Sequence, residues 1–159
     1  MLDTLKGIPL LQDLNQEQLD LITPLFEVFA CPANQIIFNQ NDQATHLYLL
    51  IKGTVALTFK PYDGAQIVLT RLHAGDVFGW SSVVGGSAYT SGICSETGIE
   101  AVRIRGRDLR KLCRDHPDLG ALMLDRLAEA VAVRWKDSRQ QVQAILHRNL
   151  ARQGKQKSE

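Results

Sequence analysis

The sequence predicts an α+β fold, in which an antiparallel β-roll of the jelly-roll type is flanked by an N-terminal helix and C-terminal helices. The hydrophobic period is helical near the start, becomes that of short strands from about residue 31 to residue 105, and is helical again afterwards. Turn residues separate these short strands, a pattern typical of a jelly roll or barrel.

The N-terminal helix is indicated by Asn15 followed by Gln18, which is the spacing of a helix cap. Pro24 should shorten or kink this helix. The apolar residues at helical spacing are Leu19, Ile22, Leu25 and Phe26.

The middle of the chain is predicted to be an antiparallel β domain. Within residues 54–60, Val55, Leu57 and Phe59 alternate with more polar positions, so a half-buried strand is expected there. Pro61 to Gly64 should then reverse the chain, with Gly64 free to take a positive φ. The expected strands are Ile36–Phe38, His46–Lys52, Thr54–Lys60, Gln66–Leu72, Tyr89–Ser95 and Ile99–Arg105.

Two helices are expected after the roll. The first runs from Asp108 to Asp115 and ends before Pro117; the second is long and can be capped by Asp118. We therefore expect a roll domain over residues 1–117, a long helix over 118–151 and a disordered tail over 152–159. The apolar positions of the long helix are Leu119, Leu122, Met123, Leu127, Ala130, Val131, Val142, Ile145 and Leu146.

Composition excludes several classes of partner and compartment. Eighteen Lys and Arg against seventeen Asp and Glu leave a net charge of +1, so nucleic acid and anionic membranes have no support. The first twenty residues contain no apolar run of a signal peptide or membrane span, and a cytoplasmic protein is expected. Cys31, Cys94 and Cys113 are far apart, which favours three reduced, packed thiols.

No catalytic or metal-binding constellation is found in the sequence. There is no P-loop, nucleophile elbow or G-x-G-x-x-G motif, so no enzyme activity and no cofactor are expected. A metal-binding jelly roll would need an H-x-H pair, but the four histidines are isolated. They are His46, His73, His116 and His147.

The loop from Gly75 to Gly92 contains the most informative motif. Two segments, HLYLLIKG ending in Gly53 and HAGDVFG from His73 to Gly79, resemble the cyclic-nucleotide-binding domain superfamily. This includes the sensor half of the catabolite-activator and fumarate-nitrate regulators, and the resemblance covers nearly the whole chain. It implies that the segment after Gly79 is a phosphate-binding cassette, in which a short helix presents backbone N–H groups to a cyclic phosphate.

Both charged residues of that cassette are replaced. The family places a Glu directly after the glycine, where Trp80 stands, and an Arg near the far end, where Tyr89 or Ala88 stands. The Glu accepts from the ribose 2′-hydroxyl and the Arg pairs with the phosphate. Each such bond contributes roughly 1.5–3 kcal/mol, so ordinary binding of cyclic AMP or cyclic GMP is not expected.

The cassette residues leave alternatives open. Ser81 and Ser82 either hold an anion or cap the short helix, and Gly85 and Gly86 either approach a ligand or form a loop tip. Trp80 either plugs the vacated pocket or stacks on an aromatic ligand; Tyr89 more often packs with its hydroxyl in solvent. The candidate pocket residues are Phe78, Gly79, Trp80, Ser81, Ser82, Ala88, Tyr89 and Thr90.

Other basic residues are expected to be solvated. Arg71, Arg103 and Arg105 could supply a missing cation, but surface positions are favoured. Only residues 151–159 follow the long helix, too few for a DNA reader of roughly twenty residues. The basic residues near the end, read as a solvated tail, are Arg148, Arg152, Lys155 and Lys157.

Two functions remain at this point. The first is a free-standing sensor or regulatory module for a small anionic or nucleotide-like ligand; the second is a ligand-free scaffold or protein-interaction subunit plugged by Trp80. The resemblance also implies that the long helix forms a homodimer. In that case residues 107–115 would be the hinge, and residues 119–146 the lid and dimer seam.

Overall fold

The computed structural model describes residues 8–83 and 87–130. A helix over residues 117–130 follows the last element named below. In chain order the elements are η1 (Pro9–Leu11), α2 (Gln16–Ile22), η2 (Thr23–Leu25), β1 (Phe26–Cys31), β2 (Ile36–Phe38), β3 (His46–Lys52), β4 (Val55–Phe59), β5 (Ile67–Leu72), β6 (Val77–Phe78), η3 (Trp80–Ser82), β7 (Gly92–Ser95), β8 (Ile99–Arg105) and α3 (Gly106–Asp115).

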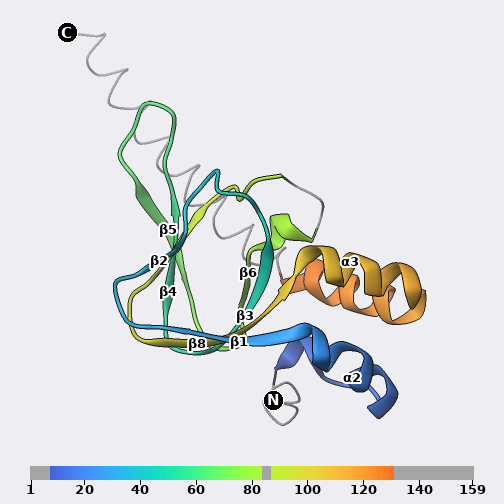
Figure 1. Cartoon of the computed structure of the whole chain (residues 1–159). Coiled ribbons are helices and arrows are strands. Elements are labelled where there is room, and N and C mark those ends of the chain that lie inside the picture. The colour runs from blue at the N-terminus through green and yellow to red at the C-terminus, as the bar shows by residue number, and fades with distance from the viewer. Residues whose placement is uncertain (1–7, 84–86, 131–159) are drawn as a thin grey trace, which may run out of the picture.

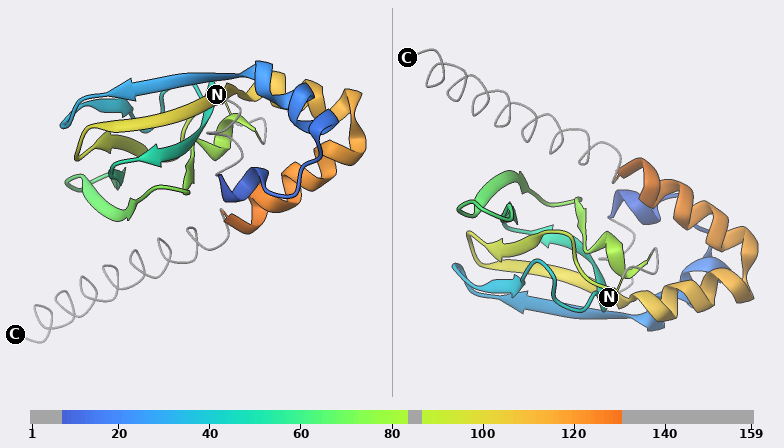
Figure 2. Two further views of the ribbon diagram at one scale, coloured as in Figure 1. Left: turned by 90° about the horizontal axis from the view of Figure 1, so that it is seen from below. Right: turned by 90° about the horizontal axis from the view of Figure 1, so that it is seen from above.

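The strands form two four-stranded antiparallel sheets, which confirms the predicted β-roll. The first sheet has the order β1-β8-β3-β6 and the second β2-β7-β4-β5. The roll lies at one end of the molecule and the helices at the other (Figures 1 and 2). The segment between β6 and β7 passes from the first sheet to the second, so the candidate cassette joins the two sheets.

Along β3 the first sheet buries both faces, and alternate residues of the strand point to opposite sides. Leu49 pairs with Val102 on the side facing the helices, whereas Tyr48 pairs with Phe78 on the side facing the second sheet. We call the two resulting clusters the helix-side core and the inner core. The helix-side core includes Ile22, Phe26, Leu47, Leu49, Val77, Val102, Ile104, Leu109, Leu112, Leu119, Met123 and Leu127. The inner core includes Phe38, Tyr48, Leu50, Val55, Leu72, Phe78, Tyr89, Ile93, Ile99 and Ala101.

The N-terminal helix begins as the sequence predicts and ends earlier. The Asn15 side chain accepts from the Gln18 N–H at 2.8 Å, and the Gln18 side chain accepts from the Asn15 N–H at 3.0 Å, forming a capping box. The prediction that Leu25 and Phe26 continue the helix is wrong. Pro24 lies within the 3₁₀ turn η2, and Phe26 begins β1, where it pairs with Ile104.

Three strands have the predicted bounds and two strands were missed. The bounds of β2, β3 and β8 agree with those predicted, while β1 and the two-residue β6 were missed. β4 is not half-buried: Ala56 and Thr58 on its second face are buried too, because β4 is a central strand with a register shift between Leu57 and Thr58. The turn closes through Gly64 N–H to the Pro61 carbonyl at 3.3 Å, without a positive φ at Gly64.

Both C-terminal helices start earlier than predicted. α3 begins at Gly106, two residues before Asp108, and the next helix begins at residue 117, so Asp118 lies inside its first turn and is not the cap. Proline suits that first position because its missing N–H has no partner there in any helix. The predicted seam beyond residue 130 and the tail lie outside the described residues.

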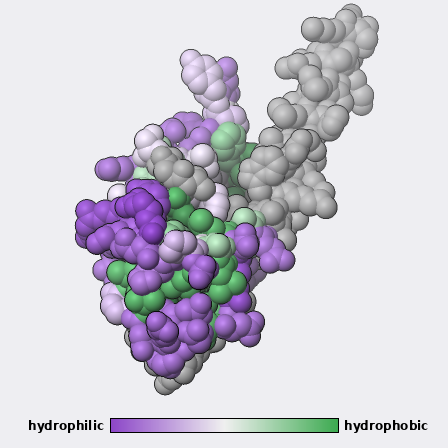
Figure 3. All heavy atoms as spheres, turned by 90° about the vertical axis from the view of Figure 1, so that its right-hand side faces the viewer, coloured by the Kyte–Doolittle hydropathy of each residue, from purple (hydrophilic) through white to green (hydrophobic). Residues whose placement is uncertain are grey.

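The helix of residues 117–130 is tied to the start of the chain. The Arg126 guanidinium donates to the carbonyls of Leu10, at 3.1 Å, and of Gln12. Apolar side chains gather in the middle of this end of the molecule, surrounded by hydrophilic ones (Figure 3). Within residues 8–83 and 87–130, no helix is long and apolar enough to cross a membrane.

Candidate functional site

The candidate cassette begins at a glycine that no other residue replaces without strain. Gly79 has a φ of 86° and a ψ of 27°, in the left-handed region, and is the N-cap of η3. A Cβ there would lie 2.5 Å from the carbonyl oxygen of His46 on β3. The turn into η3 therefore depends on close contact between two backbone segments.

The serines of η3 hold the loop itself. The hydroxyl of Ser82 is buried and donates to the Gly79 carbonyl at 2.8 Å, and no side chain caps η3, so the predicted serine cap is wrong. The Ser82 carbonyl in turn accepts from Arg110 Nη1 at 2.7 Å. A Cβ at Gly106 would overlap that same carbonyl. The start of the cassette is thus fixed to α3, while Ser81 is half-buried.

Trp80 lies away from the inner core. Its half-buried ring packs against the helix-side core, so it does not plug the space between the sheets. Phe78, two residues earlier, does point into that space: its ring stacks on Tyr48 with centroids 4.8 Å apart and planes 8° apart. The expectation that Trp80 fills the interior is corrected accordingly.

Tyr89, at the far end of the cassette, fills the interior instead. Its ring stacks on Phe38 at 3.6 Å between centroids and 13° between planes. Its hydroxyl donates to the His46 carbonyl at 2.7 Å and accepts from the His46 N–H at 3.0 Å. Tyr89 is 4% exposed, so the expectation of a solvent-facing hydroxyl is wrong. The backbone of His46 thus satisfies this hydroxyl both as a donor and as an acceptor.

The backbone of Tyr89 and Ala88 pairs with the loop of residues 41–43. Tyr89 N–H donates to the Asp42 carbonyl and Asn41 N–H donates to the Tyr89 carbonyl, each at 2.9 Å. Ala88 is half-buried and forms an isolated bridge with Gln43, while Thr90 is exposed. Gly85 and Gly86 lie outside the described residues.

One of the three candidate arginines lies on the inner side of the first sheet. Arg103 pairs in register with Glu27 on one side and Tyr48 on the other. Its Nε lies 2.6 Å from Glu27 Oε1, and its guanidinium lies 5.0 Å from the centroid of the Phe29 ring. The expectation of a solvated surface position is wrong for Arg103, whose side chain is 28% exposed.

The other two arginines lie at the surface, as predicted. Arg71 pairs with Glu96 at 2.7 Å, with its side chain 55% exposed, and Arg105 is exposed as well.

His46 connects these parts of the site. Its backbone contacts both Gly79 and Tyr89, while its ring Nδ1 lies 2.8 Å from Thr45 Oγ1 and its Nε2 lies 3.6 Å from Glu27 Oε1. Burial and, next, the charge of Arg103 lower the pKa of His46 below its usual 6.5. Burial raises the pKa of the Tyr48 hydroxyl above its usual range, and this hydroxyl accepts from Arg103 Nη1 at 3.4 Å.

Sequence reasoning missed the residues that hold Tyr89 in place. Phe38 and His46 lie far from the loop in sequence and meet it only because β2 and β3 border the interior. The three cysteines are free and half-buried. An aromatic residue at each of positions 38, 48, 78 and 89 was the available signal, since aromatic side chains cluster when buried.

The structure is a two-sheet roll with a loop between β6 and β7. This loop begins with the left-handed Gly79 and the short turn η3, and Arg110 of α3 hydrogen-bonds it. These features define the class of protein. Residues 28–116 match the family model described as cyclic nucleotide-binding domain. The chain therefore belongs to the cyclic nucleotide-binding domain family.

Similar proteins are regulators of this family. The cAMP-activated global transcriptional regulator CRP of Pasteurella multocida is 30% identical over 70% of this chain and 52% of its own. The cyclic AMP receptor protein of Thermus thermophilus is 30% identical over 79% and 60%. The chain spans about half the length of the curated relatives it matches.

Solved structures show the same fold. A putative cyclic nucleotide-binding protein from Geobacter metallireducens has a TM-score of 0.73 and 28% identity, over 84% of this chain and 96% of its own. The catabolite activator protein of Thermus thermophilus has a TM-score of 0.69 and 26% identity, over 86% and 62%.

Proposed function

We propose that the chain is a regulatory module with the cyclic nucleotide-binding fold that does not bind cyclic AMP or cyclic GMP in the usual way. The observation that carries this proposal is the position of Tyr89. Tyr89 or its neighbour Ala88 stands where the family's phosphate-binding arginine is expected, and the ring and hydroxyl of Tyr89 are both engaged, by Phe38 and by the His46 backbone.

Hydrogen-bond energies favour the observed position of Tyr89 over binding of a cyclic phosphate. If a cyclic phosphate displaced Tyr89, the half-buried N–H and carbonyl of His46 would lose their partners, at a cost of about 1–3 kcal/mol each. It would also lack the arginine bond, which contributes roughly 1.5–3 kcal/mol. Trp80, in place of the family's glutamate, offers no acceptor to a ribose hydroxyl.

The names of similar proteins are compatible with both parts of the proposal. The curated relatives are named as cAMP-activated regulators. A fold neighbour, with a TM-score of 0.65 and 18% identity, is named the regulatory subunit of a cAMP-independent protein kinase A from Trypanosoma brucei. A regulatory role without cyclic AMP is thus named for a protein of this fold.

Isothermal titration calorimetry with cyclic AMP and cyclic GMP tests the proposal directly. No binding tighter than about millimolar is expected for the wild-type chain. The double variant Trp80→Glu with Tyr89→Arg should gain affinity, because it restores the acceptor and the guanidinium. A micromolar dissociation constant for the wild type would contradict the proposal.

A ligand-free scaffold is the second candidate, and the filled inner core favours it. Phe38 contacts Tyr48, Phe78 and Tyr89, so four aromatic rings occupy the space between the sheets. A thermal-shift screen of nucleotides and other small anions separates the two functions. A true ligand at 100 times its dissociation constant adds about 2.7 kcal/mol of stability, while a scaffold shows no shift with any compound.

A further inference from the structure

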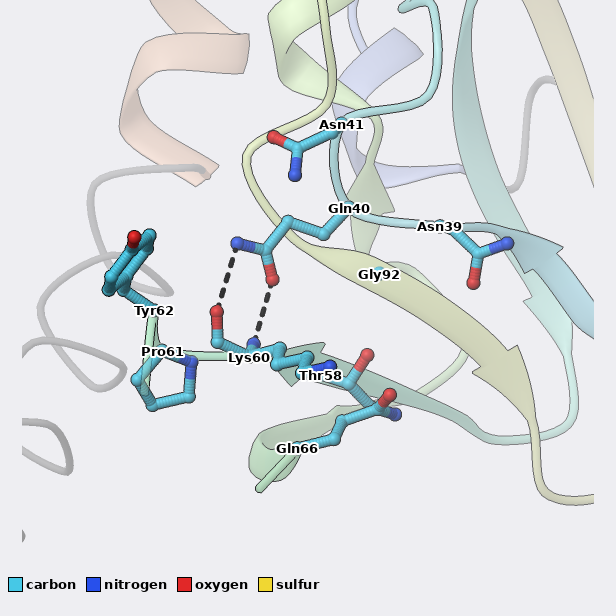
Figure 4. Close-up of a pocket in the computed structure, with 9 residues that line it drawn as sticks. All are labelled: Asn39, Gln40, Asn41, Thr58, Lys60, Pro61, Tyr62, Gln66 and Gly92. Carbon is cyan, nitrogen blue, oxygen red and sulfur yellow. Dashed lines mark hydrogen bonds between the residues drawn. The ribbon is translucent and has the colours of Figure 1, made fainter. Parts of the chain in front are cut away.

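Figure 4 shows a hollow beside the second sheet. Its volume is about 310 Å³. That lies at the lower end of the range for small-molecule pockets, about 300–1,000 Å³. It is formed by the loop after β2, the ends of β4 and β7, and the β4–β5 turn. The lining residues are Asn39, Gln40, Asn41, Thr58, Lys60, Pro61, Tyr62, Gln66 and Gly92.

Hydrogen bonds form this hollow before any ligand binds. The Gln40 side chain accepts from Lys60 N–H at 2.7 Å and donates to the Lys60 carbonyl at 3.3 Å, so it extends the sheet like a further strand residue (Figure 4). The Asn39 N–H donates to Asp42 Oδ2 at 2.8 Å, which fixes the loop. At the floor, a Cβ on Gly92 would lie 2.6 Å from Thr58 Oγ1, so the glycine leaves room for this hydroxyl.

The lining chemistry suits a ligand with many hydroxyl groups. Four of the nine lining residues carry amides, which both donate and accept, as hydroxyls do. One lining residue is a lysine, and none of the nine carries a carboxylate. Tyr62 at the turn is 99% exposed, and its ring is free to cover the apolar C–H face of a sugar.

We propose that this hollow binds a saccharide, with Tyr62 as the stacking platform and the amide of Asn41 as a hydrogen-bond partner. The site is separate from the space between the sheets and does not depend on the function proposed above. The exposed tyrosine is the observation that carries it furthest, because a fully exposed aromatic ring beside a preformed polar hollow buries apolar area only when a ligand is bound.

The hollow shares a loop with the cassette. Asn41 lines the hollow and donates its N–H to the Tyr89 carbonyl at 2.9 Å. A sugar that contacts Asn41 is therefore one hydrogen bond away from Tyr89. Binding should therefore move the amide signal of Tyr89 as well as those of the lining residues.

The test is a ¹H–¹⁵N NMR titration of the full chain with D-glucose, N-acetylglucosamine, maltose and glucose 6-phosphate, each to about 50 mM. Saturable shifts at Asn39, Gln40 and Gln66 are expected with at least one sugar. Tyr62→Ala should weaken binding about three- to tenfold, the value of one aromatic contact. Because Tyr62 is fully exposed, this change leaves the fold intact.

Val68→Ala is the matched control, since Val68 is exposed on the same hairpin but does not line the hollow. It should bind as the wild type does. Comparison of glucose with glucose 6-phosphate measures the contribution of Lys60. If glucose 6-phosphate binds more tightly and Lys60→Gln removes this difference, Lys60 contacts an anionic group of the ligand. The proposal is overturned if none of the four sugars gives a saturable shift, or if Tyr62→Ala binds as tightly as the wild type.

Discussion

The two ends of the cassette loop are held in different ways. At its start, Gly79 and Ser82 are fixed by backbone contacts and by Arg110 of α3. At its end, Tyr89 is fixed by side-chain stacking and by a hydroxyl that hydrogen-bonds both the backbone N–H and the backbone carbonyl of His46. The start is thus held by backbone contacts and packing, while the proposed function gives the end an internal contact in place of a ligand contact.

Removal of the Tyr89 side chain should have the largest effect on the free energy of unfolding. Tyr89→Ala should lower the free energy of unfolding by about 3–5 kcal/mol, because it leaves a cavity beside Phe38. Tyr89→Phe keeps the ring and should cost about 1–3 kcal/mol, since it leaves the His46 groups unpaired. Urea denaturation measures both. Equal stability of the Phe variant and the wild type would show that the hydroxyl bonds are not structural.

The start of the loop should respond to a much smaller change in volume. Gly79→Ala adds one methyl group at a left-handed φ, 2.5 Å from the His46 carbonyl. We expect a loss of about 2–4 kcal/mol by urea denaturation, from backbone strain and overpacking together. Gly98→Ala is the matched control, because a Cβ there meets nothing within 4 Å. A wild-type stability for Gly79→Ala would mean that the loop start is adaptable.

The smallest expected effect concerns His46, which touches both ends of the loop. Its folded-state pKa is lower than 6.5, mainly through burial, so the unfolded chain binds the proton more tightly. The corresponding stability is present above about pH 6.5 and is lost as the pH falls towards the folded-state pKa. The difference in unfolding free energy between the wild type and His46→Gln should therefore shrink between pH 7 and pH 5. A difference that stays constant with pH would contradict this assignment.

The roll could be predicted from the sequence because turn residues separate most of its strands. β3 and β8 were placed correctly, whereas β1 was missed because Phe26 also continues a helical spacing from Leu19. The two residues of β6 are too few to show any period.

Less of the site could be predicted than of the fold. The motif ending in Gly79 located the loop, but the direction of its side chains depends on tertiary packing. Trp80 turned towards the helices and Tyr89 towards the interior. Arg103 was assigned to solvent because nothing in its sequence neighbourhood indicates the register that places it between Glu27 and Tyr48.

The contact between α3 and the helix that follows it has a mechanical consequence. A Cβ on Gly120 would lie 2.6 Å from the Cα of Cys113, so the two helices touch backbone to backbone. Gly120 contributes no side chain to this contact, so no rotamer change at that residue can absorb a change of angle between the helices. We therefore expect the two helices to move as one unit. Arg110 on the first helix donates to the Ser82 carbonyl, and Arg126 on the second donates to the Leu10 carbonyl. A tilt of this helix pair would strain both hydrogen bonds at once.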